Sequence, residues 1–329
     1  MRDTINFRFR RWDLVKLSLT FCLLLTLFTA SAQITYETVF VDYDSAWTFK
    51  NLKIIPVRKK AGGGLPGYGG DLVPLGEALK KGLITVTERG TTSFENVHWL
   101  RFNTHTKKSV YISGGEIVSG GRQDRIIVRD TILRPSEKDQ YVPVMCVEEG
   151  RWSEKEKKFG YGNFANNHLR KVVDSTPNQV LIWGEIDRQL QAGAFKNKSF
   201  AYLSRYQDKK YMLKHDEYFR YFMDKFAKTD SNVVGFVALT GDKIIGTDIF
   251  AGTDLFYPQL DPLLHGYIDE AINSGAPVML KDPPVKRYMD PLLKDEASQE
   301  DFVRDKGKIF KDGGMVIHVN TYTKDEPVK

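Results

Sequence analysis

Short apolar runs separated by turn-like segments dominate the chain between residues 97 and 152. The runs WLRFN, SVYISGGEIV, RIIVRDTIL and QYVPVMCVEE are rich in Val and Ile, and THTKK, SGGRQD and RPSEKD separate them. Such runs predict the strands of an antiparallel sheet. Further strands are predicted over 48–57 and 83–88, and between them a short helix over 75–81 that ends at Gly82.

Helical spacing of apolar residues appears in the second half of the chain. Residues 177–194 have apolar positions three and four apart, at Val180, Trp183, Ile186 and Leu190. Residues 211–227 place His215 and a set of aromatic residues on one face. An aromatic face of this kind is typical of an amphipathic helix packed on a core rather than of a cofactor site.

Strand patterns return after residue 230. The runs VVGFVALT and KIIGTDIF predict a β-hairpin that turns at Gly241-Asp242, and GMVIHVNTY at 314–322 predicts a closing strand. Asp261 is predicted to cap a helix with Pro262 at its first position. Residues 281–312 carry eight basic and eight acidic residues, which predicts a solvated excursion.

The order of these elements predicts the fold class. It is α+β, with a β-rich antiparallel first half and with helices packed in the second half. We find no internal repeat and no clear linker, so residues 33–329 are expected to form a single domain.

The first 32 residues have the pattern of a secretory signal peptide. A basic start precedes the apolar run LSLTFCLLLTLF, and Ala30-Ser31-Ala32 forms a small-x-small cleavage site. The apolar run, Leu17 to Phe28, is shorter than the roughly 20 residues that span a bilayer. We therefore expect export to the periplasm or the outside of the cell, without stable membrane insertion after cleavage; an uncleaved anchor is the alternative.

Removal of that segment changes the net charge and the number of cysteines of the chain. Five basic and two acidic residues leave, which lowers the formal net charge from +6 to +3 and leaves Cys146 as the one cysteine. An intramolecular disulfide is then excluded, and the small positive excess argues against a nucleic-acid partner.

No motif in the chain predicts a cofactor or a metal ion. The six histidines are scattered, so a histidine metal site is unsupported, and His318 in an apolar strand is expected to be a hydrogen-bonded core residue. Gly62, Gly64 and Gly67 formally match a dinucleotide-binding pattern, but Pro66 interrupts it, so a loop is favoured.

Candidate chemistry concentrates between Gly114 and Trp152, in GGEIVSGGRQDR and CVEEGRW. Two carboxylates, Glu116 and Glu148, are candidate general bases. The candidate ligand-binding residues are Gln123, Arg125, Cys146, Arg151 and Trp152, since arginines clamp anions and tryptophan stacks. The alternative is a structural Glu–Arg network that closes the end of a sheet. Cys146 fits a small buried residue better than a nucleophile.

This stretch resembles the pattern GEE-(apolar)2-GGxQ(N/D)R followed by IPVxCVExGRW. That pattern belongs to the ADP-ribosylglycohydrolase- and rhodanese-phosphatase-superfamily-associated protein domain family, a domain of unknown function. The resemblance runs from about Thr48 to Tyr322. The residues that match the motif are Gly115, Glu116, Gly121, Gln123, Arg125, Cys146, Glu148, Gly150, Arg151 and Trp152. Ile117 departs from it, because the family often has a second acidic residue there.

Three functions remain open from the sequence. We expect first an exported protein that binds a small polar or anionic ligand or a partner through the two motifs. The alternatives are a hydrolase of a phosphorylated or ADP-ribose-like compound, to whose chemistry the family name refers, and a structural protein of the envelope. In the hydrolase, Glu116 or Glu148 would be the base and Arg125 and Arg151 would hold phosphate.

Overall fold

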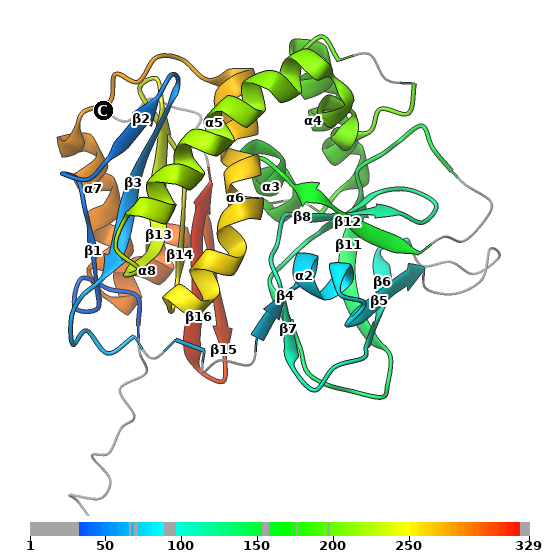
Figure 1. The fold of residues 1–329 in the computed structure, drawn as a ribbon, viewed down its shortest axis with the longest axis horizontal. Helices are drawn as coiled ribbons and strands as arrows, with labels where there is room; N and C mark the ends of the chain where they lie inside the picture. The colour runs from blue at the N-terminus through cyan, green and yellow to red at the C-terminus, as the bar shows by residue number, and fades with distance from the viewer. Residues whose placement is uncertain are drawn as a thin grey trace, which may run out of the picture. The chain divides into compact units, whose positions relative to one another are not determined.

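A computed structural model describes residues 33–65, 67–68, 72–88, 97–152, 158–175, 177–195 and 198–322. The predicted signal peptide lies outside these residues. Within the described residues, the strands β1 to β12 all precede residue 165, whereas helices predominate after it. Figure 1 shows this change along the chain. This distribution confirms the predicted α+β class with a β-rich, largely antiparallel first half.

The first half has one labelled helix, α2 (Leu75–Lys80), among its strands. The strands are β1 (Val39–Val41), β2 (Trp47–Phe49), β3 (Leu52–Lys59), β4 (Leu72–Pro74), β5 (Ile84–Glu88), β6 (Trp99–Thr104), β7 (Ser109–Ile112), β8 (Glu116–Gly120), β9 (Arg125–Ile127), β10 (Thr131–Leu133), β11 (Gln140–Cys146) and β12 (Phe159–Phe164).

The second half alternates longer helices with two strand pairs. Its elements are α3 (Asn167–Ser175), α4 (Gln179–Ala192), the 3-10 helix η1 (Tyr202–Gln207), α5 (Lys209–Lys228), β13 (Val233–Thr240), β14 (Lys243–Phe250), α6 (Thr253–Ser274), α7 (Asp282–Leu293), α8 (Glu296–Val303), β15 (Gly307–Asp312) and β16 (Met315–Tyr322). Within the described residues, no helix is long and apolar enough to cross a membrane.

A seven-stranded antiparallel sheet joins the two ends of the described chain. Its order is β1-β3-β13-β14-β16-β15, with β2 paired to β3. Side chains of β13 alternate between its faces: Phe236 and Ala238 face α5 and α6, whereas Val237 and Leu239 face α7. Because both faces are covered, β13 is buried along its whole length (Figure 1).

A second, six-stranded sheet has the order β12-β8-β9-β11-β6-β5. One face packs on α2 and on the three-stranded sheet β10-β7-β4, in which β4 and β7 run parallel. The other face packs Ile117, Ile126 and Met145 against α3, α4 and η1. The motif of residues 114–152 therefore lies in a sheet that is covered on both sides.

Two predicted boundaries are wrong. The strand predicted over 48–57 is two strands, because Lys50 has a positive φ of 48° and the chain turns there. The helix predicted from Asp261 begins at Thr253 and carries Pro258 and Pro262 inside it. The buried residues of its first turns, such as Phe256, outweigh the local cost of the prolines.

The predicted solvated excursion over 281–312 is also wrong, because α7, α8 and β15 occupy it. Val285, Met289 and Leu292 recur at helical spacing and are fully buried against the seven-stranded sheet. The equal numbers of acidic and basic residues suggested a solvated segment. In α7 these charged residues lie on the opposite face from the buried apolar residues, which recur at helical spacing. In α4, Val180 was predicted on the buried face but is 72% exposed.

Candidate functional site

The second motif, CVEEGRW, forms a polar network with the turn that ends β8. Arg151 Nε donates to Glu148 Oε2 at 2.7 Å, and Arg151 Nη2 donates to Asp124 Oδ1 at 2.9 Å. The same guanidinium donates to the carbonyls of Gly120 and Gly121. Glu148 and Arg151 therefore bind each other, and Arg151 also links residues 148–151 to the turn that follows β8.

Gln123 and Arg125 lie deeper in the same region. Gln123 Nε2 donates to the carbonyl of Glu148 at 2.6 Å, and Arg125 Nη1 donates to the carbonyl of Gln123 at 2.9 Å. Arg125 is fully buried, and its Nη2 lies 3.8 Å from Glu88 Oε2. Glu88 also accepts the backbone N–H of Arg122 at 2.9 Å. Glu88 was not identified from the sequence, although it is the charged end of an otherwise alternating strand.

Cys146 and Trp152 occupy contrasting environments. The backbone N–H and carbonyl of Cys146 bind the side-chain amide of Gln179, at 2.9 and 2.7 Å. Burial raises the pKa of the Cys146 thiol, which favours its neutral form over the nucleophilic thiolate. Trp152 is 51% exposed, and the guanidinium of Arg122 lies 5.5 Å from its ring centroid.

Glu116 is separate from the other motif carboxylate. It starts β8, is 1% exposed, and its Oε2 accepts the N–H of Ser113 at 2.7 Å. Oε1 has no hydrogen-bond partner among the described residues. Burial, with a smaller contribution from Asp130, raises the pKa of Glu116 to about 8. This carboxyl group is therefore largely protonated at neutral pH, which suits a proton donor better than the predicted base.

A cavity of about 430 Å³ lies beside the first motif, and we call it the β9–β15 cavity. It lies between the Gly114-Gly115 turn, residues 126–130, α3 and the β15–β16 pair. Gly115 has a φ of 105°, and a Cβ atom there would lie 3.0 Å from the Arg170 side chain. The first motif thus requires glycine where it borders this cavity.

Three cations line the β9–β15 cavity: Arg129, Arg170 and Lys308. Burial lowers the pKa of Lys308; Asp130 raises it, and Arg129 lowers it by a smaller amount, so both a carboxylate and a guanidinium lie within electrostatic reach of Lys308. Lys308 also contacts Asp174. Asn320 lines the same cavity, is 5% exposed, and its Nδ2 has no hydrogen-bond partner in the described part of the chain. The lining therefore combines three cations with one carboxylate, Asp130, and two of the cations already have carboxylate partners, Lys308 with Asp174 and Arg170 with Asp248.

His318 lies behind this cavity, between two carboxylates. Its Nδ1 is 2.6 Å from Asp130 Oδ2, and its Nε2 is 2.9 Å from Asp248 Oδ1. Burial opposes ionisation of the ring, but the carboxylates outweigh it and raise the pKa of His318 to about 9. Asp248 also binds Arg170 at 2.9 and 3.1 Å. His318 is thus a bridging cation, which confirms the predicted hydrogen-bonded core histidine.

Asp130, Arg170 and Asp248 were not identified from the sequence. Asp248 had a signal, because it is a charged residue inside the apolar run KIIGTDIF. Its partners lie 78 residues earlier in the chain and 70 residues later. Sequence spacing does not predict contacts of that length, so only the fold brings them together.

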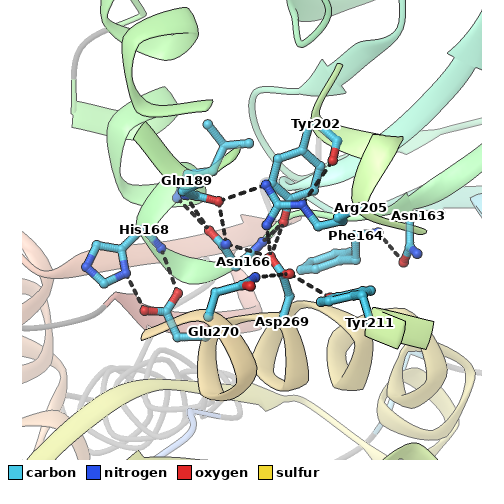
Figure 2. A network of polar contacts seen from close by, with 12 residues as sticks. Asn163, Phe164, Asn166, His168, Gln189, Tyr202, Arg205, Tyr211, Asp269 and Glu270 are labelled. Carbon is cyan, nitrogen blue, oxygen red and sulfur yellow. Dashed lines mark hydrogen bonds and ion pairs between the residues drawn. The ribbon is translucent and has the colours of Figure 1, made fainter. Parts of the chain in front are cut away.

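Figure 2 shows a larger buried network around Asp269 of α6. Arg205 Nη1 and the hydroxyl of Tyr211 each donate to Asp269 at 2.6 Å, and Tyr202 donates at 2.9 Å. Asn166 donates at 2.7 Å and is bound in turn by Gln189. Next to it, His168 pairs with Glu270. The network connects α4, η1 and α5 to α6, and its geometry is that of a structural ion pair.

No group of three or more His, Cys, Asp or Glu side chains suited to a metal ion occurs within the described residues. Comparison with the curated proteins and with the solved structures found no match. The ARG and Rhodanese-Phosphatase-superfamily-associated Protein domain matches residues 40–316. This match covers most of the chain and includes both motifs, so the chain belongs to that domain family, whose function is unknown.

Proposed function

We propose that the β9–β15 cavity binds a small anionic ligand and that the protein is an exported binding protein. The observation that carries the proposal is that Arg129 and Lys308 line one cavity together with Asn320, whose Nδ2 has no hydrogen-bond partner among the described residues. A bound anion would gain charge-assisted hydrogen bonds from Arg129 and Lys308, in competition with Asp174, which already contacts Lys308. The amide of Asn320 would gain a hydrogen bond at the same time.

The donor chemistry favours a phosphate-bearing or carboxylate ligand. Arginine and lysine bind both groups through charge-assisted hydrogen bonds. Arg170 also lines the cavity, but Asp248 compensates its charge, so the ligand contacts are assigned to Arg129 and Lys308. The association of the family name with ADP-ribose and phosphate chemistry agrees with this ligand class.

Catalysis has weaker support than binding. In the hydrolase hypothesis, Glu116 or Glu148 acts beside Arg125 and Arg151. Arg125 is fully buried beside Glu88, and Arg151 is bound by Glu148 and Asp124. Neither guanidinium lines the β9–β15 cavity. We therefore place the anion site at Arg129 and Lys308.

Calorimetric titration with inorganic phosphate, ADP-ribose and a sugar phosphate tests the proposal. Each good charge-assisted hydrogen bond is worth about 1.5–3 kcal/mol, so Arg129→Ala and Lys308→Met should each weaken binding at least about tenfold. Arg220→Ala is the matched control, because this arginine lies on α5, outside the cavity. Higher salt should weaken binding to the parent protein.

Equal affinity of the parent and both cavity variants would place the anion elsewhere. Failure of every anion to bind would favour the structural role. Export rests on the basic and apolar start of the chain. N-terminal sequencing of the mature protein, expected to begin at Gln33, tests it, and an intact Met1 would contradict it.

A further inference from the structure

A second cavity, of about 660 Å³, lies against α2, β12 and α6, and we call it the α2–α6 cavity. Glu116 lines it, whereas Gly114 and Gly115 line the β9–β15 cavity. The first motif therefore borders two separate cavities. The walls of the second are partly apolar, through Leu79 and Pro262 among others.

Two polar side chains of this cavity have unused hydrogen-bonding atoms. Oε1 of Glu116 and the hydroxyl of Tyr161 are both buried without a hydrogen-bond partner among the described residues. Tyr161 stands at a β-bulge, where the register of β12 against β8 shifts between Tyr161 and Asn163. A bulge redirects side chains locally, which is how β12 presents Tyr161 beside Glu116 at this cavity.

The α6 backbone supplies a third acceptor. Pro258 and Pro262 lie one turn apart inside α6, and both line the cavity. Proline has no N–H, so the carbonyl of Pro258 lacks the helical donor that residue 262 would normally provide. This carbonyl therefore lacks its usual helical hydrogen bond, and in the proposal below it accepts one from the ligand.

The charges near Glu116 do not neutralise it. Asp130 lies within electrostatic reach, and Tyr161 and Tyr111 lie close enough for Glu116 to affect their pKa values. Arg170 packs on Gly115, next to Glu116 in the chain, but its guanidinium is bound by Asp248. The other charged groups that line the cavity are Glu77, Lys80 and Asp261. Of these, Glu77 pairs with Lys81, and Asp261 lies 3.4 Å from His265.

We propose that the α2–α6 cavity binds a primary amine as its ammonium ion, held by Glu116, Tyr161 and the carbonyl of Pro258. An ammonium group has three N–H donors, and the cavity offers three acceptors beside apolar walls for an aliphatic chain. An anion would meet Glu116, Asp261 and Glu77. A neutral polyol would use donors as well, which are Tyr161, Lys80 and the protonated carboxyl group of Glu116, and the butanol comparison below separates it from an amine.

Binding of an ammonium ion changes the protonation of Glu116. The neutral carboxyl group loses its proton to the solvent, and the carboxylate then pairs with the ammonium group, which keeps all three protons. The raised pKa of Glu116, about 8, means that this release is nearly complete per bound amine at pH 6.5. Affinity should rise by up to about tenfold per pH unit between pH 6 and 8 and level off above pH 8.

Calorimetry with butylamine, in two buffers that are not amines and differ in ionisation enthalpy, tests the proposal. The full chain should bind butylamine with release of about one proton at pH 6.5, and should bind 1-butanol and butyrate at least about tenfold more weakly. Glu116→Gln should abolish the proton release and weaken binding of butylamine at pH 8 or above by at least about tenfold.

Two further variants protect the test against misfolding. Pro262→Ala restores a helical donor to the carbonyl of Pro258, so it should weaken binding several-fold, retain the proton release and leave the helix intact. Pro291→Ala, in α7 and outside the cavity, is its matched control and should leave affinity unchanged. Arg129→Ala should also leave butylamine binding unchanged, which separates this site from the anion site.

Three outcomes would overturn the proposal. One is equal binding of 1-butanol and butylamine without proton release, which identifies a site for neutral ligands. Another is tighter binding of butyrate than of butylamine, which would show that the α2–α6 cavity prefers an anion to a cation. The third is no detectable butylamine binding by a folded protein at pH 8.

Discussion

The network around Asp269 and the linings of the two cavities both contain buried polar groups. They differ in whether those groups have hydrogen-bond partners. Asp269 accepts bonds from Arg205, Tyr202, Tyr211 and other donors, so its charge is fully compensated. Glu116 Oε1 and Asn320 Nδ2 have no partner in the described part of the chain. The first arrangement leaves Asp269 fully hydrogen-bonded, whereas the second leaves polar atoms unpaired at the two proposed sites.

An unsatisfied buried polar group costs about 1–3 kcal/mol. Such a cost is best explained where the group borders a cavity that a ligand can enter, and Glu116 and Asn320 both do. The polar residues of CVEEGRW resemble the Asp269 network, because Glu148 and Arg151 bind each other. Motif membership therefore does not separate Glu116 from Glu148, whereas an unpartnered atom at a cavity does.

The largest expected effect comes from breaking the satisfied network. Asp269→Ala leaves Arg205 buried without its counter-ion, which should lower the free energy of unfolding by about 3–5 kcal/mol. Urea denaturation followed by circular dichroism measures the change. The control is Asp301→Ala, at an exposed ion pair with Arg304, which should stay within about 0.5 kcal/mol of the parent. A loss below 1 kcal/mol for Asp269→Ala would remove the distinction between the two kinds of polar cluster.

The second effect is a pH dependence at His318. Its pKa is about 9 in the folded protein against 6.5 for a free histidine, so the folded state holds the proton more tightly. The resulting stability, about 3 kcal/mol, is fully present below pH 6.5 and is lost as the pH rises towards 9.

The titration of Glu116 must be eliminated by substitution, because its raised pKa also lowers the free energy of unfolding as the pH rises from 4.5 to about 8. Urea midpoints should therefore be compared between Glu116→Gln and the double variant Glu116→Gln, His318→Gln, from pH 6 to 10. The single variant should lose stability over this range, and the double variant should lose much less. Parallel curves would show that His318 is not a bridging cation.

The smallest expected effect sharpens the distinction within the motif itself. Glu148→Gln keeps the shape of the side chain but removes the charge that Arg151 binds, so it should cost about 1–3 kcal/mol of stability. It should not change anion binding at the β9–β15 cavity, which Glu148 does not line. Calorimetry with inorganic phosphate would detect the contrary result, a loss of affinity in a folded variant.

Much of the fold could be predicted from the chain because local patterns carry it. The hairpin of β13 and β14 turns at Gly241-Asp242 as predicted, α5 matches its predicted aromatic face, and α2 ends before Gly82. Failures arose where tertiary packing outweighs a local signal. Pro262 lies inside α6 rather than at its start, and charges on one face of α7 hid its buried face.

The sequence by itself determined the fold class, the family and the stretch that carries the unusual polar residues. It could not separate the two carboxylates of the motif, because Glu116 and Glu148 look alike as letters. Only the tertiary structure decided that Glu148 is paired, that Glu116 borders a cavity, and that Arg129 and Lys308, 179 positions apart, line one cavity. The physical reason is that hydrogen-bond satisfaction, burial and repulsion depend on neighbours that are distant in sequence and adjacent only after folding.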